Sequence, residues 1–165
     1  MKRLTLVRHG KSSWKDPQLS DFDRPLNRRG KADAPEMGRR IAERGEQYDL
    51  ILTSPAKRAV STVKRIAGEI GFPESGIVKD VRLYAAEARE ILRVVGEIDD
   101  LFANVLLCGH NPGITDFCTL VSDLAIVAMP TCGVVTVEFP GCSWRDVSAG
   151  AGTLLYFDSP KRNRE

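Results

Sequence analysis

The chain has 165 residues, of which 42% are hydrophobic and 28% charged, and its formal net charge is +2. This length suffices for one domain with a sizeable core, and the composition is that of a globular protein. The balance of 24 basic and 22 acidic residues argues against a nucleic-acid or membrane surface. No apolar run could span a bilayer or act as a signal peptide, so we expect a cytoplasmic protein.

The first predicted elements are a buried strand, a loop and a helix. Leu4–Val7 is apolar or β-branched and predicts the strand, and the polar segment Lys15–Pro25 predicts a surface loop. A helix is expected over Asn27–Arg44, with Gly45 ending it. Pro35 should either mark the true start of this helix or kink it.

A second strand and helix follow in the same order. Asp49–Thr53 predicts the strand. Ser54 is expected to be the N-cap of the next helix, with Pro55 at its first position and its end near Ile70. A short third strand is expected over Ile77–Val81.

The chain then predicts another helix, a central strand and a further helix. Glu87–Ile98 has apolar residues at helical spacing, and Val105–Cys108 is a continuous apolar run typical of a central strand. Asn111 and Pro112 repeat the cap-plus-proline pattern and should open a helix that ends near Val121.

The last predicted strands are Val134–Phe139 and Thr153–Phe157, joined by the turn-rich segment Pro140–Gly150. This short connection without a helix indicates antiparallel neighbours. The charged tail, Ser159–Glu165, is expected to fray. Together the elements predict one α/β domain over 1–165: a three-layer sandwich whose mixed, mostly parallel sheet has helices on both faces.

The cysteines predict free thiols. No pair has the spacing of a metal-binding or redox motif, and nothing in the sequence indicates export. With two histidines in the chain, a zinc site is improbable. We expect no metal and no cofactor. The modest net charge and the lack of an obvious apolar patch leave a monomer as the default expectation. The four thiols are Cys108, Cys118, Cys132 and Cys142.

Both histidines follow predicted strands directly. His9 comes after Arg8 at the end of the first strand, and His110 comes after Gly109 at the end of the fourth. In open α/β sheets, ligands bind outside the carboxyl ends of the strands. One such histidine could merely cap a strand end, but the pair indicates a shared site.

Arg58 lies one turn into the helix after the second strand, where helix N–H groups and a guanidinium suit an anion. With Arg8 and His110 it would surround His9 with positive charge and hold a phosphoryl group. His9 must be neutral to attack phosphorus, and nearby cations disfavour its protonation. The carbonyl of Gly10 is a plausible acceptor that would fix the tautomer.

Three motifs in order, LVRHGKSSW, TSPAKRA and LLCGHNPGI, resemble the histidine phosphatase superfamily, which includes the phosphoglycerate mutases. The segments DFDRPLNRRGKADAP, LYAA and YFDSPKR are similar to its small phosphohistidine phosphatase branch, the SixA type. The resemblance covers nearly the whole chain. It implies a phosphoglycerate mutase-like α/β fold and a metal-independent phosphatase.

The resemblance also implies residue roles. His9 matches the histidine that becomes phosphorylated, and Arg8, Arg58 and His110 match the residues that clamp the phosphoryl group, with Gly10 in the same phosphate-binding turn. Phosphoryl transfer to His9 would precede hydrolysis of phospho-His9.

Two departures from larger family members matter. The chain has little room for the helical insertions that cover their sites, so the site should be open. The proton donor is also uncertain: Glu87 follows LYAA, where the family's glutamate is expected, and Asp21 and Asp23 are rivals in the loop after the first strand. Each could equally be a solvated carboxylate.

No single carboxylate can be assigned from the sequence as the acid that protonates the leaving group. This favours phosphohistidine as the substrate, because imidazole leaves more readily than an alkoxide and needs less help from an acid. We therefore expect a phosphatase for phosphohistidine on a signalling or phosphocarrier protein. A phosphatase for small esters and a non-catalytic module that binds a phosphorylated partner are the alternatives, and a mutase is disfavoured because it needs a closed site. Lys11, Trp14 and Arg24 could line the rim and touch such a partner, or be plain surface.

Overall fold

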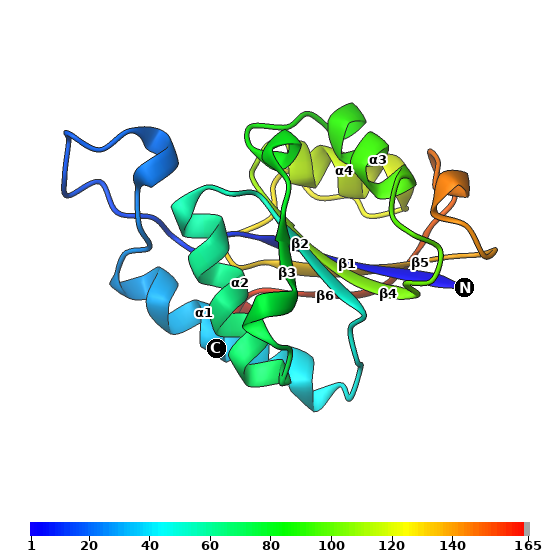
Figure 1. Cartoon of the computed structure of the whole chain (residues 1–165), viewed down its shortest axis with the longest axis horizontal. Coiled ribbons are helices and arrows are strands. Elements are labelled where there is room, and N and C mark those ends of the chain that lie inside the picture. Colours follow the sequence, from blue (N-terminus) through cyan, green and yellow to red (C-terminus); the bar gives the residue numbers. More distant parts are fainter. Residues whose placement is uncertain (164–165) are drawn as a thin grey trace.

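The computed structural model describes residues 1–163 and has three layers (Figure 1). Within this range one six-stranded sheet has the order β3-β2-β4-β1-β5-β6. Helices α1 and α2 pack on one face, and α3 and α4 on the other. The strands are β1 (Lys2–Arg8), β2 (Leu50–Thr53), β3 (Ile77–Lys79), β4 (Asn104–Gly109), β5 (Val134–Phe139) and β6 (Thr153–Asp158). The helices are α1 (Arg28–Glu43), α2 (Lys57–Ile70), α3 (Ala88–Gly96) and α4 (Gly113–Val121).

Strand β1 lies inside the sheet and separates its two kinds of pairing. It is parallel to β4, with Arg8 opposite Gly109, and antiparallel to β5. Strands β4, β2 and β3 continue in parallel, and β6 pairs antiparallel with β5, as predicted. The parallel register brings the carboxyl ends of β1 and β4 to one edge of the sheet, as the sequence predicted.

Alternation along β1 supplies both layers of the core. Leu4 and Leu6 pack with α3 and α4, whereas Val7 packs with α1 and α2, and all three are fully buried. Successive strand side chains point to opposite faces, so a sheet covered on both sides needs apolar residues at consecutive positions.

Helix α1 begins where the sequence predicted. The side chain of Asn27 accepts a hydrogen bond from the amide of Gly30, which satisfies one of the free N–H groups at the helix start. The helix continues through Pro35, so this proline does not mark its start. Gly45, just beyond the end, adopts φ +74°, a left-handed conformation that glycine adopts readily.

The predicted start of the second helix was wrong by two residues. Ser54 is not the N-cap and Pro55 is not the first helical residue, because the backbone remains extended at Ala56 and α2 begins at Lys57. The Ser54 hydroxyl instead contacts both the Ala56 amide and the imidazole of His110.

Two other boundaries were also displaced. Strand β3 ends at Lys79, because Asp80 caps a 3₁₀ turn that begins at Val81. Helix α4 begins at Gly113, with Pro112 as its N-cap and a cis peptide bond before this proline. The strands and helices themselves were predicted correctly.

The expectation of a frayed tail was wrong for the residues that the structure describes; residues 164–165 lie outside them. Pro160–Asn163 forms a 3₁₀ turn after β6. From α1, Arg40 makes an ion pair with Asp158 at 3.2 Å and donates hydrogen bonds to the carbonyls of Ser159 and Pro160. These contacts hold the turn against the helix.

In the described part of the chain, none of the helices is long and apolar enough to cross a membrane. The four cysteines are free thiols, as predicted, and Cys108 is buried in the core while Cys142 is exposed.

Candidate active site

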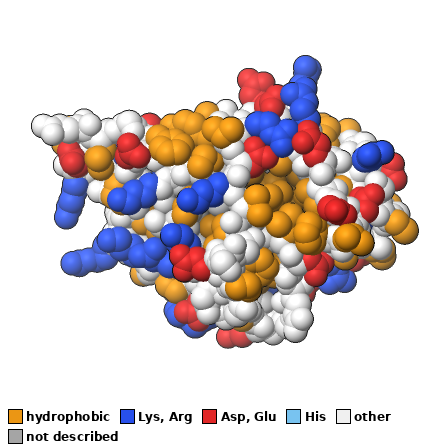
Figure 2. Space-filling view, in the orientation of Figure 1, with side chains coloured by type: hydrophobic (Ala, Val, Ile, Leu, Met, Phe, Trp, Pro, Cys, Tyr) orange, Lys and Arg blue, Asp and Glu red, His pale blue; other side chains and the backbone are white. Residues whose placement is uncertain are grey.

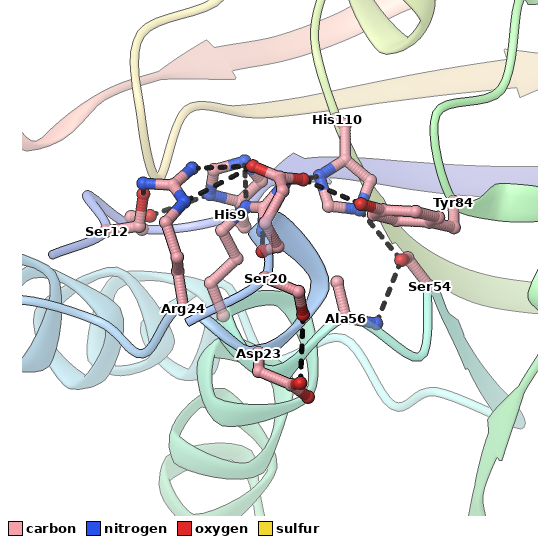
Figure 3. A network of polar contacts seen from close by, with 12 residues as sticks. His9, Ser12, Ser20, Asp23, Arg24, Ser54, Ala56, Tyr84 and His110 are labelled. Carbon is pink, nitrogen blue, oxygen red and sulfur yellow. Dashed lines mark hydrogen bonds and ion pairs between the residues drawn. The ribbon is translucent and has the colours of Figure 1, made fainter. Parts of the chain in front are cut away.

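A pocket of about 310 Å³ opens at the carboxyl ends of β1 and β4, where the two histidines meet (Figure 3). The centroids of the two imidazole rings are 4.9 Å apart. The other lining residues come from the turn after β1, from α2, and from the loops around α4. The lining consists of Arg8, His9, Lys11, Ser12, Trp14, Arg24, Arg58, His110, Asn111 and Thr131.

His9 is held by the turn that ends β1. Its backbone N–H donates to the carbonyl of Gly109, and its Nδ1 lies 2.7 Å from the carbonyl of Gly10. This carbonyl can only accept, so Nδ1 carries the proton and Nε2 keeps its lone pair. The expected acceptor for His9 is therefore present.

The turn is tight because Gly10 touches three other parts of the chain. Its N–H donates to the Thr62 hydroxyl on α2 at 2.9 Å. A Cβ atom at this position would lie 3.1 Å from the sulfur of Cys132 and 3.2 Å from the Cα of Gly30. A side chain at position 10 would therefore require these neighbours to move by a few tenths of an ångström.

Burial keeps His9 neutral. The pKa of His9 is lowered to about 3, chiefly by burial and to a smaller extent by the neighbouring His110, Arg58 and Arg8, against the opposing effect of the Gly10 carbonyl. The sequence predicted a neutral His9 from the cations alone, but removal from water is the larger cause. Near neutral pH the Nε2 lone pair is available.

His110 is anchored through the opposite ring nitrogen. Its Nε2 lies 2.7 Å from the hydroxyl of Ser54, and its Nδ1 lies 3.4 Å from Nη2 of Arg58. Burial, then the charge of Arg58, lowers the pKa of His110 to about 4, while the Asp21 carboxylate partly opposes this shift. Near neutral pH both imidazoles are uncharged.

Arg58 is buried between the histidines and uses each of its three nitrogens. Nε donates towards Nε2 of His9 at 3.4 Å, and Nη2 lies beside His110. Nη1 donates to the carbonyl of Asp21 at 2.6 Å, and Nη2 donates to its carboxylate at 3.0 Å. A phosphoryl group that binds Arg58 must therefore compete with Asp21.

Arg8 is the partly buried cation at the end of β1. Its Nη1 donates to the carbonyl of Met129 at 2.7 Å, whereas its buried Nε has no hydrogen-bond partner among the described residues. Burial lowers the pKa of this guanidinium. A free, buried donor is energetically costly unless an acceptor binds there.

Asp21 joins the site from the loop after β1. Its carboxylate accepts hydrogen bonds from Tyr84, Arg58 and Arg24. These bonds, with that of Tyr84 the largest contributor, lower its pKa to about 2. Asp21 is therefore ionised near neutral pH and can accept a proton rather than donate one.

The two other candidate proton donors do not line the pocket around the histidines. Glu87 is exposed and lines a neighbouring pocket with Asn111 and Pro112. Asp23 is exposed and accepts a hydrogen bond from Ser20. Among the three carboxylates, the structure brings Asp21 alone into contact with the pocket's cations.

The suggested rim residues Lys11, Trp14 and Arg24 all line the pocket. The guanidinium of Arg24 lies over the Trp14 ring, 3.5 Å from its centroid, and donates hydrogen bonds to Ser12 and Asp21. Trp14 itself is 76% exposed, so one face of the indole is available to another molecule.

Sequence reasoning missed two contributors to the site. Tyr84 donates to the Asp21 carboxylate at 2.7 Å, and its ring packs edge-on against His110. Tyr84 lies in the LYAA stretch, whose resemblance to the family implied no role for this tyrosine. Ser54 was interpreted as a helix cap, although it lies directly after β2 at the same sheet edge as both histidines.

Comparison with known proteins places these residues in a family. The family model of the histidine phosphatase superfamily (branch 1) matches residues 4–84. An uncharacterized chloroplastic protein of Arabidopsis thaliana is 30% identical over 159 residues, which cover 92% of this chain and 72% of that protein.

Solved structures match over nearly the whole length. A structure from Agrobacterium tumefaciens, assigned as a phosphohistidine phosphatase SixA, is 28% identical with a TM-score of 0.80, over 96% of this chain and 98% of that one. The protein histidine phosphatase SixA complexed with tungstate has a TM-score of 0.81 at 19% identity, over 96% and 97% of the two chains.

Proposed function

Because the chain belongs to the histidine phosphatase superfamily, we propose that it is a metal-independent phosphatase that uses His9 as its nucleophile. The observation that carries this proposal is the state of the His9 ring. Nδ1 faces the Gly10 carbonyl at 2.7 Å, so the lone pair is on Nε2, and burial keeps the ring neutral. A neutral, oriented imidazole is what attack on phosphorus requires.

The proposed reaction has two displacements. In the first, the Nε2 lone pair of His9 forms a bond to phosphorus, and the bond from phosphorus to the leaving group breaks with its electron pair on the leaving atom. In the second, a water oxygen forms a bond to the phosphorus of phospho-His9 as the P–N bond breaks, and the electron pair of that bond returns to Nε2 and restores neutral His9. Inorganic phosphate is released, and the proton that the water loses to solvent balances the proton that the first leaving group takes up.

Positive charge around His9 stabilises the transferring group. Arg8 and Arg58 present guanidinium donors to a phosphoryl group whose charge spreads over three equatorial oxygens. Gly10 lies in the turn that follows Arg8 and His9, and its N–H holds this turn to Thr62 on α2, the helix that carries Arg58. Removal of one such donor commonly lowers kcat by about 10²–10³-fold.

His110 can gain charge when substrate binds. A phosphoryl dianion in the pocket favours the protonated form and raises the pKa of this imidazole from its value of about 4 in the free protein. Ser54 fixes the ring through Nε2, so a proton on Nδ1 would face the pocket. We assign His110 to the phosphoryl clamp in this protonated form.

We propose phosphohistidine on a signalling or phosphocarrier protein as the substrate. Asp21 is ionised and Glu87 lines another pocket, so a leaving group that needs little protonation suits this site. An exposed Trp14 at the rim suits a phosphohistidine displayed on a protein surface. The name of the A. tumefaciens relative agrees with this substrate, and the cytoplasm remains our proposed location.

The direct test compares kcat/KM for a phosphohistidine-bearing carrier protein with kcat/KM for sugar and nucleotide phosphates. We expect the carrier protein to be the better substrate, and a chelator to leave turnover unchanged. Faster hydrolysis of the small esters would indicate the ester phosphatase instead. His9→Asn should still bind inorganic phosphate but lose turnover; unimpaired turnover in this variant would refute the mechanism.

A further inference from the structure

A second cationic pocket adjoins the first. It has a volume of about 370 Å³ and shares Arg8, Lys11 and Thr131 with the pocket around His9. Its lining includes four cations and no carboxylate. The residues are Arg8, Lys11, Arg29, Pro130, Thr131, Pro160 and Lys161.

The sheet topology brings these cations together from distant parts of the sequence. Strand β6 is antiparallel to β5, which is antiparallel to β1, so the end of β6 lies at the same edge as Arg8. Arg40 donates hydrogen bonds to two carbonyls of the turn after β6 and thereby positions Lys161. Arg29 lies in the first turn of α1, and Lys11 lies in the turn after β1.

The charge of the second pocket is largely uncompensated. Within residues 1–163, neither the ammonium group of Lys11 nor that of Lys161 makes an ion pair or hydrogen bond, and the Nε of Arg8 is buried without a hydrogen-bond partner. Arg29 has an ion pair, with Asp33 at 3.5 Å. Figure 2 shows Lys and Arg side chains gathered over the end of the molecule that carries the start of α1. Convergent cations with free donors favour an anionic occupant.

We propose that this pocket is a second anion subsite, which binds a carboxylate or phosphate group carried by the substrate next to its phosphoryl group. The inference rests on the proposed phosphatase function, because the shared Arg8 and Lys11 make one substrate the natural occupant of both pockets. A substrate with a single isolated charge would leave Lys161 unpaired. The second anion could come from an acidic residue beside a phosphohistidine or from a second acidic group of a small phosphate ester.

The test uses substrate pairs that differ in the second anion alone. One pair consists of phosphohistidine peptides with Glu or Gln beside the phosphohistidine, and the other of carboxyphenyl phosphate and phenyl phosphate. The ratio of kcat/KM within each pair is measured for the wild type, Lys161→Glu and Lys79→Glu. Lys79 is a matched control, because it is exposed and lies on β3, the outermost strand on the side of the sheet away from β6.

In the wild type we expect the anionic member of at least one pair to be preferred. Lys161→Glu should lower that ratio about fivefold, because KM for the anionic member rises more than KM for the neutral member. Lys79→Glu should leave the ratios of both pairs unchanged. The pair that responds identifies the source of the anion. Ratios near one in both pairs for the wild type, or an equal ratio in Lys161→Glu, would overturn the subsite.

A binding measurement separates this inference from the proposed function. If no substrate is hydrolysed, the phosphatase proposal fails, and titration calorimetry with inorganic phosphate and pyrophosphate in a His9→Asn background decides the subsite. Tighter binding of pyrophosphate that Lys161→Glu abolishes would support the subsite. Equal binding of the two anions, or an advantage that survives Lys161→Glu, would contradict it.

Discussion

The floor and the rim of the active-site pocket are built in different ways. The floor consists of His9, Arg58 and His110, which are 8%, 5% and 7% exposed and are fixed by strand ends, a helix and backbone carbonyls. The rim includes Trp14, which is 76% exposed, and Asp21 beside it has a side chain that is 51% exposed; both lie on the loop after β1. Burial therefore sets the chemistry of the floor, whereas hydrogen bonds between side chains set that of the rim.

This difference predicts where substitutions act. Changes in the floor should alter the chemical step, since a buried group has no water to replace a lost partner. Changes in the rim should alter binding by small factors, because exposed contacts are screened and replaceable.

Among the floor residues that hold the phosphoryl group, we expect the largest loss of activity from Arg58→Ala. It removes the guanidinium that reaches both histidines, and kcat should fall about 10²–10³-fold. Arg65→Ala, on the same helix but away from the pocket, is the matched control. Steady-state kinetics with both variants measures the effect, and a loss confined to KM would assign Arg58 to binding alone.

The pH dependence of stability should distinguish the floor from the rim. The pKa values of His9 and His110, about 3 and about 4 when folded, lie below the unfolded value of about 6.5. Below pH 6.5 the unfolded chain therefore binds more protons, and the free energy of unfolding should fall as pH drops. The slope should be up to about 1.4 kcal/mol per pH unit for each histidine.

Urea denaturation between pH 5 and pH 7.5 measures this slope, and His9→Asn should reduce it by the share of one histidine. An unchanged slope in the variant would show that His9 is not buried in its neutral form. Asp21 contributes for a different reason, because hydrogen bonds favour its ionised carboxylate in the folded protein. Its folded pKa, about 2, is depressed, so its stabilisation is present above the ordinary carboxyl range and lost as pH falls towards 2.

A smaller effect is expected at the rim for Asp21→Asn. The Asp21 carboxylate competes with phosphate for Arg58, so its neutralisation should tighten competitive inhibition by inorganic phosphate about threefold. Tyr84→Phe removes a hydrogen bond to the same carboxylate but keeps its charge, and serves as the comparison. A fall in kcat of about 10²-fold or more in Asp21→Asn would instead identify it as a proton-transfer residue.

The smallest expected effect is that of Glu87→Gln. Glu87 lines a neighbouring pocket and is exposed, so kcat for phosphohistidine and for esters should stay within about twofold of the wild type. A loss that is much larger for esters than for phosphohistidine would show that Glu87 reaches the leaving group and acts as its acid.

The fold and the floor could be predicted because their signals are local. The strand that ends in Arg-His-Gly, the apolar fourth strand and the turn residues that follow each place their histidine without reference to distant residues. The parallel register then brings the two strand ends together. The same reasoning gave the Gly10 carbonyl as the partner of His9.

The rim and the element boundaries depended on contacts that the local sequence does not encode. Tyr84 and Asp21 are 63 residues apart, and Arg40 meets Ser159 across 119 residues. Ser54 had the sequence signature of a helix cap, but its hydroxyl bonds to His110 and the backbone stays extended. Local propensity was overridden in each case by a tertiary hydrogen bond.

The central claim is that Nε2 of His9 becomes covalently phosphorylated. The most direct measurement mixes the protein with a phosphohistidine-bearing protein, quenches in base and maps added phosphate by mass spectrometry, with His9→Ala in parallel. We expect a base-stable, acid-labile phosphate on His9 that is absent from the variant. Unimpaired turnover in His9→Ala, without any label on His9 in the wild type, would contradict the account.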